Sequence, residues 1–215
     1  MMLTMNRQPK MTTERLILRP FTLSDAPFVQ QLAGDEAIAS TALNIPHPFE
    51  DRMAEEWIST HQSDYEAAKA ANFAIILRHE QIFIGAAGLS ISSSDSRAEL
   101  GYWIGKRYWG YGYASEAAQA LIHFGFEVLC VNRIYATCLK RNIASAKVLQ
   151  KLGMAHEGSL RQHVYHRGEF EDLEEYGLLK QDFTSNPSPH PRNNPRMVPH
   201  PGRYDIFSPK SRHPS

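Results

Sequence analysis

Cysteine is scarce in this chain of 215 residues, which contains only Cys130 and Cys138. Two cysteines without CxxC spacing exclude a disulfide scaffold and provide no zinc or redox motif, so we expect both to be buried thiols. Long apolar runs are missing too: none approaches the ~18 residues of a membrane span, and the first ten residues lack the apolar segment of a signal peptide. These absences predict a cytoplasmic protein with no membrane partner.

The chain also lacks an excess of either charge, because 23 Lys and Arg balance 23 Asp and Glu. Their placement is uneven: residues 184–215 carry five basic residues and one Asp, which leaves 18 basic and 22 acidic residues in 1–183. The body is therefore at −4 and has no sign of a continuous basic surface. Nucleic acid is not expected to be a direct partner.

Composition divides the chain into three segments. Residues 1–11 are predicted to be a flexible arm. Residues 184–215 hold eight of the 13 prolines and almost no apolar periodicity, so they cannot bury enough surface to offset their ordering entropy and are predicted to be a disordered basic tail. A docking peptide anchored by Tyr204 and Phe207 is the alternative for this tail. Residues 12–183 are expected to form one domain.

Residues 12–183 alternate between strand and helix patterns. Amphipathic spacing predicts four helices that begin near Ser24, Glu50, Ala114 and Asn142. Runs rich in β-branched and aromatic residues, separated by short turns, predict seven strands at 14–21, 72–78, 81–91, 97–104, 133–139, 154–166 and 169–180. The order predicts an α/β fold with a mixed, mostly antiparallel seven-stranded sheet flanked by about four helices.

The segment from Glu99 to Ala117 is the most informative part of the sequence. A strand ends there, Gly110 and Gly112 interrupt an aromatic loop, and a helix begins near Ala114. Glycines directly before a helix allow several backbone N–H groups to converge on an anion, so the loop is a candidate pyrophosphate cradle; an ordinary glycine turn is the alternative. A Walker loop is absent, and the third glycine of a Rossmann fingerprint is replaced by Ser115.

The pattern Arg107-x-x-Gly110-x-Gly112-x-Ala114 resembles the acyl-CoA signature of the GNAT N-acyltransferase superfamily, (Gln/Arg)-x-x-Gly-x-(Gly/Ala). The segments AELGYWIGKRYWGYGYASEA (98–117) and NIASAKVLQKLGMAHEG (142–158) extend the resemblance to the branch with the ribosomal-protein-alanine N-acetyltransferases. It covers about residues 12–183. It implies splayed central strands, here 97–104 and 133–139, with acetyl-CoA as cosubstrate and no metal.

The resemblance also implies which residues bind acetyl-CoA. Asn142 and Ser145 match family positions near the thiol end of the cosubstrate, although an N-cap and an N3 residue are their structural alternatives. Backbone groups of the strand and loop are expected to hold the pantetheine and the pyrophosphate, at Tyr102, Trp103 and Ile104, and at Arg107, Tyr108, Trp109, Gly110, Tyr111, Gly112, Tyr113 and Ala114.

Transfer to an amine requires removal of a proton, because an α-amine with a pKa of ~8 is mostly protonated at pH 7. Glu99 precedes the loop and is our candidate base; a surface strand glutamate is the alternative. Many relatives place a tyrosine as proton donor where this chain has Leu149, so Ser145 is the candidate donor to the thiolate, with Tyr165 and Tyr176 as remote alternatives. Cys138 gives only weak support for a covalent intermediate, and His163 and His166 point to opposite strand faces and make a poor metal site.

The sequence therefore predicts an acetyl-CoA-dependent N-acetyltransferase that works by direct attack in a ternary complex. A protein N-terminal amine is the first expectation for the acceptor, and a small amine such as an amino acid, polyamine or antibiotic is the second. A noncatalytic acyl-CoA-binding module is the rival from another class. The protein is expected to be a monomer or homodimer.

Overall fold

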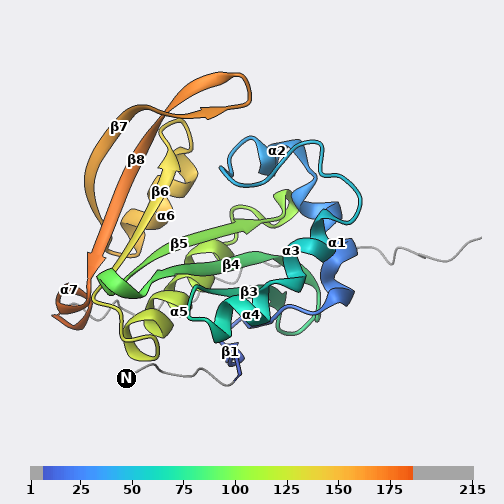
Figure 1. The fold of residues 1–215 in the computed structure, drawn as a ribbon, viewed down its shortest axis with the longest axis horizontal. Coiled ribbons are helices and arrows are strands. Elements are labelled where there is room, and N and C mark those ends of the chain that lie inside the picture. The colour runs from blue at the N-terminus through green and yellow to red at the C-terminus, as the bar shows by residue number, and fades with distance from the viewer. Residues whose placement is uncertain (1–6, 186–215) are drawn as a thin grey trace, which may run out of the picture.

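The fold comes from a computed structural model, which describes residues 7–185 (Figure 1). One eight-stranded sheet has the order β1-β2-β3-β4-β5-β6-β8-β7. Its strands are β1 (Met11–Thr12), β2 (Leu16–Pro20), β3 (Ala70–Leu77), β4 (Phe83–Ser92), β5 (Arg97–Ile104), β6 (Arg133–Leu139), β7 (Ala155–His166) and β8 (Glu169–Leu179). The helices are α1 (Ala26–Ala33), α2 (Glu36–Ala39), α3 (Met53–Ser59), α4 (His61–Glu66), α5 (Tyr113–Glu127), α6 (Ile143–Lys151) and α7 (Lys180–Ser185).

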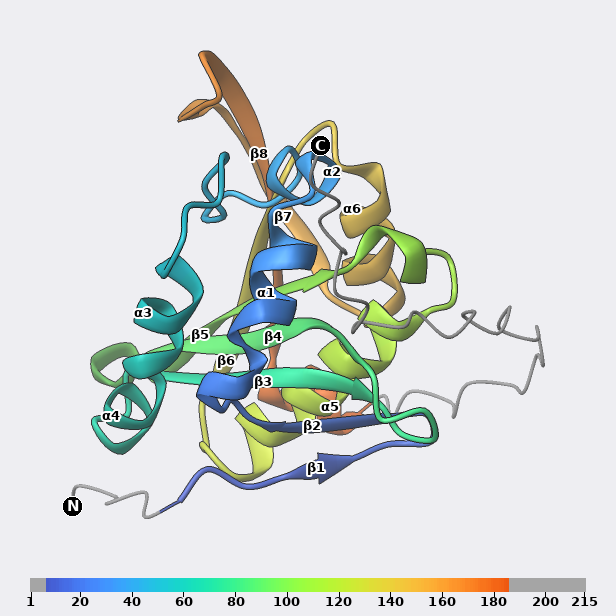
Figure 2. The ribbon, with the colours of Figure 1, turned by 90° about the vertical axis from the view of Figure 1, so that its right-hand side faces the viewer.

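The helices form two layers, with α3 and α4 on one side of the sheet and α5 and α6 on the other (Figure 2). Helix α5 packs closely on the sheet because Gly125 has no side chain: a Cβ there would lie 2.8 Å from Cδ1 of Ile134. The main core between α5 and the sheet includes Leu89, Leu121 and Ile122. The predicted mixed α/β architecture is confirmed, with one strand more than expected.

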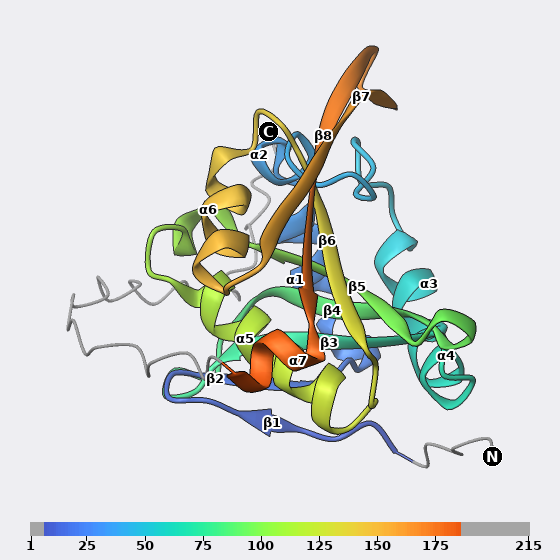
Figure 3. The same ribbon diagram turned by 90° about the vertical axis from the view of Figure 1, so that its left-hand side faces the viewer.

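The central strands part soon after they meet. All other strand pairs are antiparallel, but β5 pairs with β6 in parallel, and only from Arg97 to Glu99. Beyond this point β5 continues beside β4, and β6 continues beside β8. The two strands therefore diverge like a V, as Figure 1 shows. Figure 3 shows the β7–β8 hairpin projecting beyond the rest of the sheet.

Local hydrogen bonds explain where the predicted second helix breaks. The sequence predicts one helix from about Glu50, whereas the structure has α3 and α4, separated at Thr60. The hydroxyls of Ser59, Thr60 and Ser63 each donate to a carbonyl three residues earlier, at Glu56, Trp57 and Thr60. Such bonds compete with the regular helix ladder.

Two expectations at the periphery are wrong. The described part of the N-terminal arm packs on the domain, because Gln8 is buried with its Nε2 donating to the carbonyl of Asn72, and Met11 pairs with Leu18. Cys130 is exposed, since α5 has already ended and the chain turns there with φ +55°, whereas Cys138 is buried as predicted.

The C-terminal boundary differs slightly from the prediction. Helix α7 runs to Ser185, and Phe183 packs against the rings of His123 and Phe126. The predicted tail from residue 186 onward lies outside the described residues. Within residues 7–185, no helix combines the length and apolar character needed to cross a bilayer.

Candidate active site

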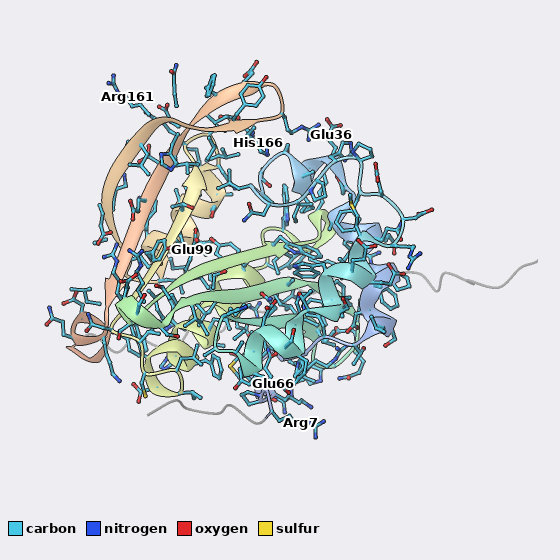
Figure 4. The ribbon with its side chains drawn as sticks, in the orientation of Figure 1. Arg7, Glu36, Glu66, Glu99, Arg161 and His166 are labelled. Atoms are coloured by element: carbon cyan, nitrogen blue, oxygen red, sulfur yellow. The ribbon has the colours of Figure 1, made fainter. Side chains whose placement is uncertain are left out.

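A cleft of about 1200 Å³ opens where β5 and β6 part. Its walls come from both strands, from the glycine loop before α5, from the first turn of α6, and from α1, α3 and the segment 41–49. Figure 4 shows Glu99 beside β6 near the closed end of the V. The divergence of the strands leaves the edge of residues 100–104 that faces β6 without a strand partner among the described residues.

The glycine loop has the conformation that the sequence leads us to expect. Gly110 and Gly112 both have φ +82°, a left-handed value that is costly for other residues, and Gly112 is the N-cap of α5. No side chain caps this helix, so its first N–H groups are available to an anion. The predicted loop residues that line the cleft are Tyr108, Trp109, Gly110, Gly112, Tyr113 and Ala114.

Two predicted loop residues support the loop from outside the cleft wall. The guanidinium of Arg107 lies over the Tyr108 ring, 4.8 Å from its centroid. The Tyr111 ring stacks on that of Tyr113 at 5.8 Å. The indole N–H of Trp109 donates to the carbonyl of Ile104, which ties the start of the loop to the end of β5.

Arg15 braces the same loop, a role that the sequence did not reveal. Its Nη1 donates to the carbonyl of Tyr111 at 2.9 Å, and its Nε donates to Oε2 of Glu116 at 2.6 Å. Glu116 lies in the first turn of α5, where its carboxylate would oppose binding of an anion. Pairing with Arg15 counters this charge. The two residues are 101 positions apart, so no local pattern connects them.

Glu99 lies on the face of the sheet that α1, α3 and α4 cover, which is called the α1–α4 side of the cleft. Strand alternation places Ala98, Leu100 and Ile104 against the α5 core, and Trp103 against the cluster built on α1 and α3. Glu99 shares the Trp103 side, is half-buried, and lines the cleft. Its Oε1 accepts a hydrogen bond from Thr137 Oγ1 at 3.2 Å. The carboxylate is thus held at the vertex and open to the cleft.

Tyr102 and Ser145 contact each other on the other face of the sheet, where α5 and α6 lie. The Tyr102 hydroxyl lies 2.9 Å from Ser145 Oγ, and the buried Cys138 lines the same cleft. Burial raises the pKa of Tyr102 well above its usual range, although the Ser145 hydrogen bond acts in the other direction. Burial likewise raises the pKa of Cys138. These three groups are therefore protonated at neutral pH and can donate hydrogen bonds.

The sequence identified only the backbone of Tyr102 as functional, and the structure adds its hydroxyl. Tyr102 lies on β5 and Ser145 on α6, so their contact depends on the tertiary fold. The remote alternatives lie elsewhere: Tyr165 is exposed on the β7–β8 hairpin, and Tyr176 is buried in β8, where its hydroxyl accepts from Gln150 Nε2 at 3.5 Å.

Asn142 caps α6 at the cleft wall. Its Oδ1 accepts from the Ser145 N–H at 3.1 Å, as predicted, and its Nδ2 donates to the carbonyl of Thr41 at 3.3 Å. Arg141 adds a second link to this segment, because its Nη2 donates to the carbonyl of Ser40 and its Nε to Oε1 of Glu171, both at 2.7 Å. These bonds hold segment 40–41 against the start of α6.

The candidate metal ligands remain apart. His163 is exposed and His166 buried, in agreement with opposite strand faces. Figure 4 shows His166 near the hairpin end of the molecule, well away from Glu99. Residues 7–185 contain no group of three or more His, Cys, Asp and Glu side chains arranged to hold a metal ion.

The family model of the acetyltransferase (GNAT) domain matches residues 15–155. The chain belongs to this family. The uncharacterized N-acetyltransferase p20 of Bacillus licheniformis is 36% identical over 173 residues, which are 80% of this chain and 96% of that protein. The ribosomal-protein-serine acetyltransferase of Escherichia coli is 28% identical over 123 residues, 57% of this chain and 65% of that one.

A solved GNAT structure shares the fold. The GNAT acetyltransferase of Bacillus anthracis has a TM-score of 0.72 and 28% identity, and the match covers 80% of this chain and 99% of that one. This GNAT chain is therefore an N-acetyltransferase, and GNAT enzymes use acetyl-CoA. Its similarity to ribosomal-protein acetyltransferases agrees with the branch that the sequence resembles.

Proposed function

We propose that this GNAT enzyme transfers the acetyl group of acetyl-CoA directly to a primary amine, and that the acceptor is the N-terminal amine of a protein. The observation that carries this proposal is the parting of β5 and β6 after Glu99, next to the uncapped N-terminus of α5. An unpaired strand edge and an anion-binding helix start thus occur at one cleft. The name of the Escherichia coli relative, a ribosomal-protein-serine acetyltransferase, supports a polypeptide acceptor.

The residues at the cleft fit acetyl-CoA. The left-handed Gly110 and Gly112 leave room for close approach to backbone N–H groups, where the pyrophosphate would bind. The free edge of residues 102–104 would pair with the amides of pantetheine, and Asn142 and Ser145 would border its thiol end. Acetyl-CoA supplies a thioester carbonyl that an amine can attack. Binding from both ends of the cleft orients this group toward Glu99 and the α1–α4 side.

Glu99 prepares the acceptor. Its carboxylate, held by Thr137, takes a proton from the amine, either directly or through a water molecule. The amine is then neutral and nucleophilic on the side of β5 that faces α1 and α3. The carboxylate also attracts the protonated amine before the proton is removed, because the two groups have opposite charges.

The opposite side of the V stabilises the negative charge that develops during transfer. Backbone N–H groups on the free edge of β5 donate hydrogen bonds to the thioester carbonyl oxygen, so no special side chain is needed there. The hydroxyls of Ser145 and Tyr102 donate hydrogen bonds to the departing thiolate sulfur. Because the pKa of Tyr102 lies above that of a thiol (~8.5), these hydroxyls act mainly as hydrogen-bond donors and do not complete a proton transfer.

A thiol-release assay with acetyl-CoA and a panel of acceptors tests the proposal. Peptides with different N-terminal residues should release CoA faster than polyamines, free amino acids or aminoglycosides at equal concentration. Mass spectrometry should locate one acetyl group on the α-amine. Faster turnover of small amines would assign the acceptor to that class, and acetyl-CoA binding without turnover of any amine would assign the chain to the noncatalytic rival.

A further inference from the structure

Two glycines face each other on the sheet surface that carries Glu99. Gly88 of β4 and Gly101 of β5 are register partners, and both line the cleft. Along β5 the same side carries Glu99 and Trp103, each about 7 Å from Gly101 by strand geometry. A Cβ built on Gly101 meets nothing within 4 Å. The sheet surface over Gly101 is therefore open between the Glu99 carboxylate and the Trp103 indole ring, and this open space is called the slot below.

The other glycine makes room for an asparagine. A Cβ on Gly88 would lie 2.3 Å from Oδ1 of Asn72, its register partner on β3. The carboxamide of Asn72 thus lies across β4, beside the open space above Gly101, since neighbouring strands are only about 4.8 Å apart. Within residues 7–185 this carboxamide makes no side-chain hydrogen bond; Gln8 Nε2 donates instead to the backbone carbonyl of Asn72.

Resting on the proposed transfer to a protein N-terminus, we infer that Asn72 binds the first peptide group of the acceptor above Gly101. A carboxamide offers both donors and an acceptor, so it can bind either the C=O or the N–H of a peptide group, whereas a carboxylate can only accept and an ammonium can only donate. The amine of the same residue then reaches Glu99. Trp103 borders the slot at its other end.

The charges around the slot favour a peptide over a free amino acid. Glu56 and Glu99 line the cleft, whereas Arg141 is its only Lys or Arg within the described residues, and Arg141 already binds Glu171 and the Ser40 carbonyl. A free carboxylate next to the amine would therefore find no available cation. A neutral peptide group in the same place finds the Asn72 carboxamide.

The test compares two acceptors that differ only beyond the amine-bearing carbon. One is a trialanine peptide with an amidated C-terminus, and the other is isopropylamine, which keeps the branched carbon and lacks the peptide group. Asn72→Ala should raise KM for the peptide about tenfold, the value of one or two lost hydrogen bonds, and leave KM for isopropylamine within about twofold. The Kd of acetyl-CoA should not change. Asn132→Ala, the same change at an exposed site outside the cleft, should alter none of these values.

Gly101→Val is a second variant, in which the new side chain occupies the slot. It should raise KM for the peptide with unchanged acetyl-CoA affinity, because the new side chain enters the open space on the acceptor side. Equal losses on peptide and isopropylamine in Asn72→Ala, or weaker acetyl-CoA binding, would overturn this inference alone. A parent enzyme that acetylates isopropylamine but not the peptide would overturn the polypeptide acceptor itself, and the inference with it.

Discussion

Glu99 joins the two central strands at the point where they separate, because its carboxylate accepts from Thr137 of β6 while the residue itself belongs to β5. If it removes the amine proton, Glu99→Gln should lower kcat by about 10²–10⁴-fold, the usual contribution of a general base. Acetyl-CoA affinity should hold, and raising the pH should partly restore the rate, since more of the acceptor is then neutral. Steady-state kinetics from pH 6.5 to 9.5 provide the measurement.

A different kinetic pattern would identify another role for this residue. A higher acceptor KM at unchanged kcat would mean that Glu99 binds the ammonium and that another group removes the proton. Full activity with an unaltered pH profile would eliminate both roles.

The Tyr102–Ser145 pair acts as one unit, so its variants should not be additive. Ser145→Ala and Tyr102→Phe should each lower kcat by about tenfold with little change in acetyl-CoA Kd, because the hydroxyls matter most as charge develops on sulfur. The double variant should lose less than the sum of the two single losses. Tyr65→Phe, which removes the hydroxyl of a tyrosine outside the cleft lining, is the control. Unchanged kcat in both single variants would leave these residues a packing role only.

Two glycine variants distinguish backbone strain from blockage of the loop surface before α5. Gly112→Val should weaken acetyl-CoA binding, because the left-handed backbone is strained and a β-branched side chain blocks the loop surface. Gly153→Val imposes the same strain, of about 1–2 kcal/mol, at φ +80° after α6 and outside the cleft lining. Isothermal calorimetry should show lost affinity in the first variant and none in the second. Undiminished affinity in a folded Gly112→Val protein would contradict the pyrophosphate assignment.

Stability of the whole domain should depend on pH through His61. This histidine is buried between Phe21 and Trp57, and neither ring nitrogen has a hydrogen-bond partner among the described residues. Burial lowers its pKa from 6.5 to about 4. Between pH 6.5 and 4, His61 is therefore protonated in the unfolded chain but neutral in the folded protein. The free energy of unfolding should fall as pH decreases from about 6.5 to 4.

Urea unfolding across this pH window measures the effect, which is at most ~3 kcal/mol for this shift. His61→Phe should flatten the pH dependence, whereas His163→Gln, at an exposed position, should leave it as in the parent. An equally steep curve in His61→Phe would show that other groups cause the acid sensitivity.

The C-terminal segment should matter little to the folded domain. Residues 186–215 contain all eight prolines counted in the C-terminal 32 residues, a composition that disfavours regular packing. Removing them, while keeping Phe183 and the rest of α7, should change Tm by less than about two degrees and leave turnover of a small amine nearly unchanged. Scanning fluorimetry and the thiol-release assay provide the measurements. A larger fall in Tm would show that this segment packs on the domain.

The sequence by itself determined the elements whose signals are local. The strands Arg97–Ile104 and Arg133–Leu139 have the predicted bounds, Asn142 caps α6 as expected, and Gly110 and Gly112 mark the loop. Side-chain periodicity, capping and glycine conformation act over a few residues, so they can be read without knowing the fold. The motif spacing was specific enough to identify the family.

Only the tertiary structure decided which distant groups meet at the cleft. The brace from Arg15 to Glu116, the hydroxyl pair of Tyr102 and Ser145, and the carboxamide of Asn72 over Gly88 all join different elements. Each contact depends on strand register and on helix position over the sheet, and a shift of one residue would turn the side chains to the opposite face. Local patterns contain no information about that register, so these contacts could not be predicted from the sequence.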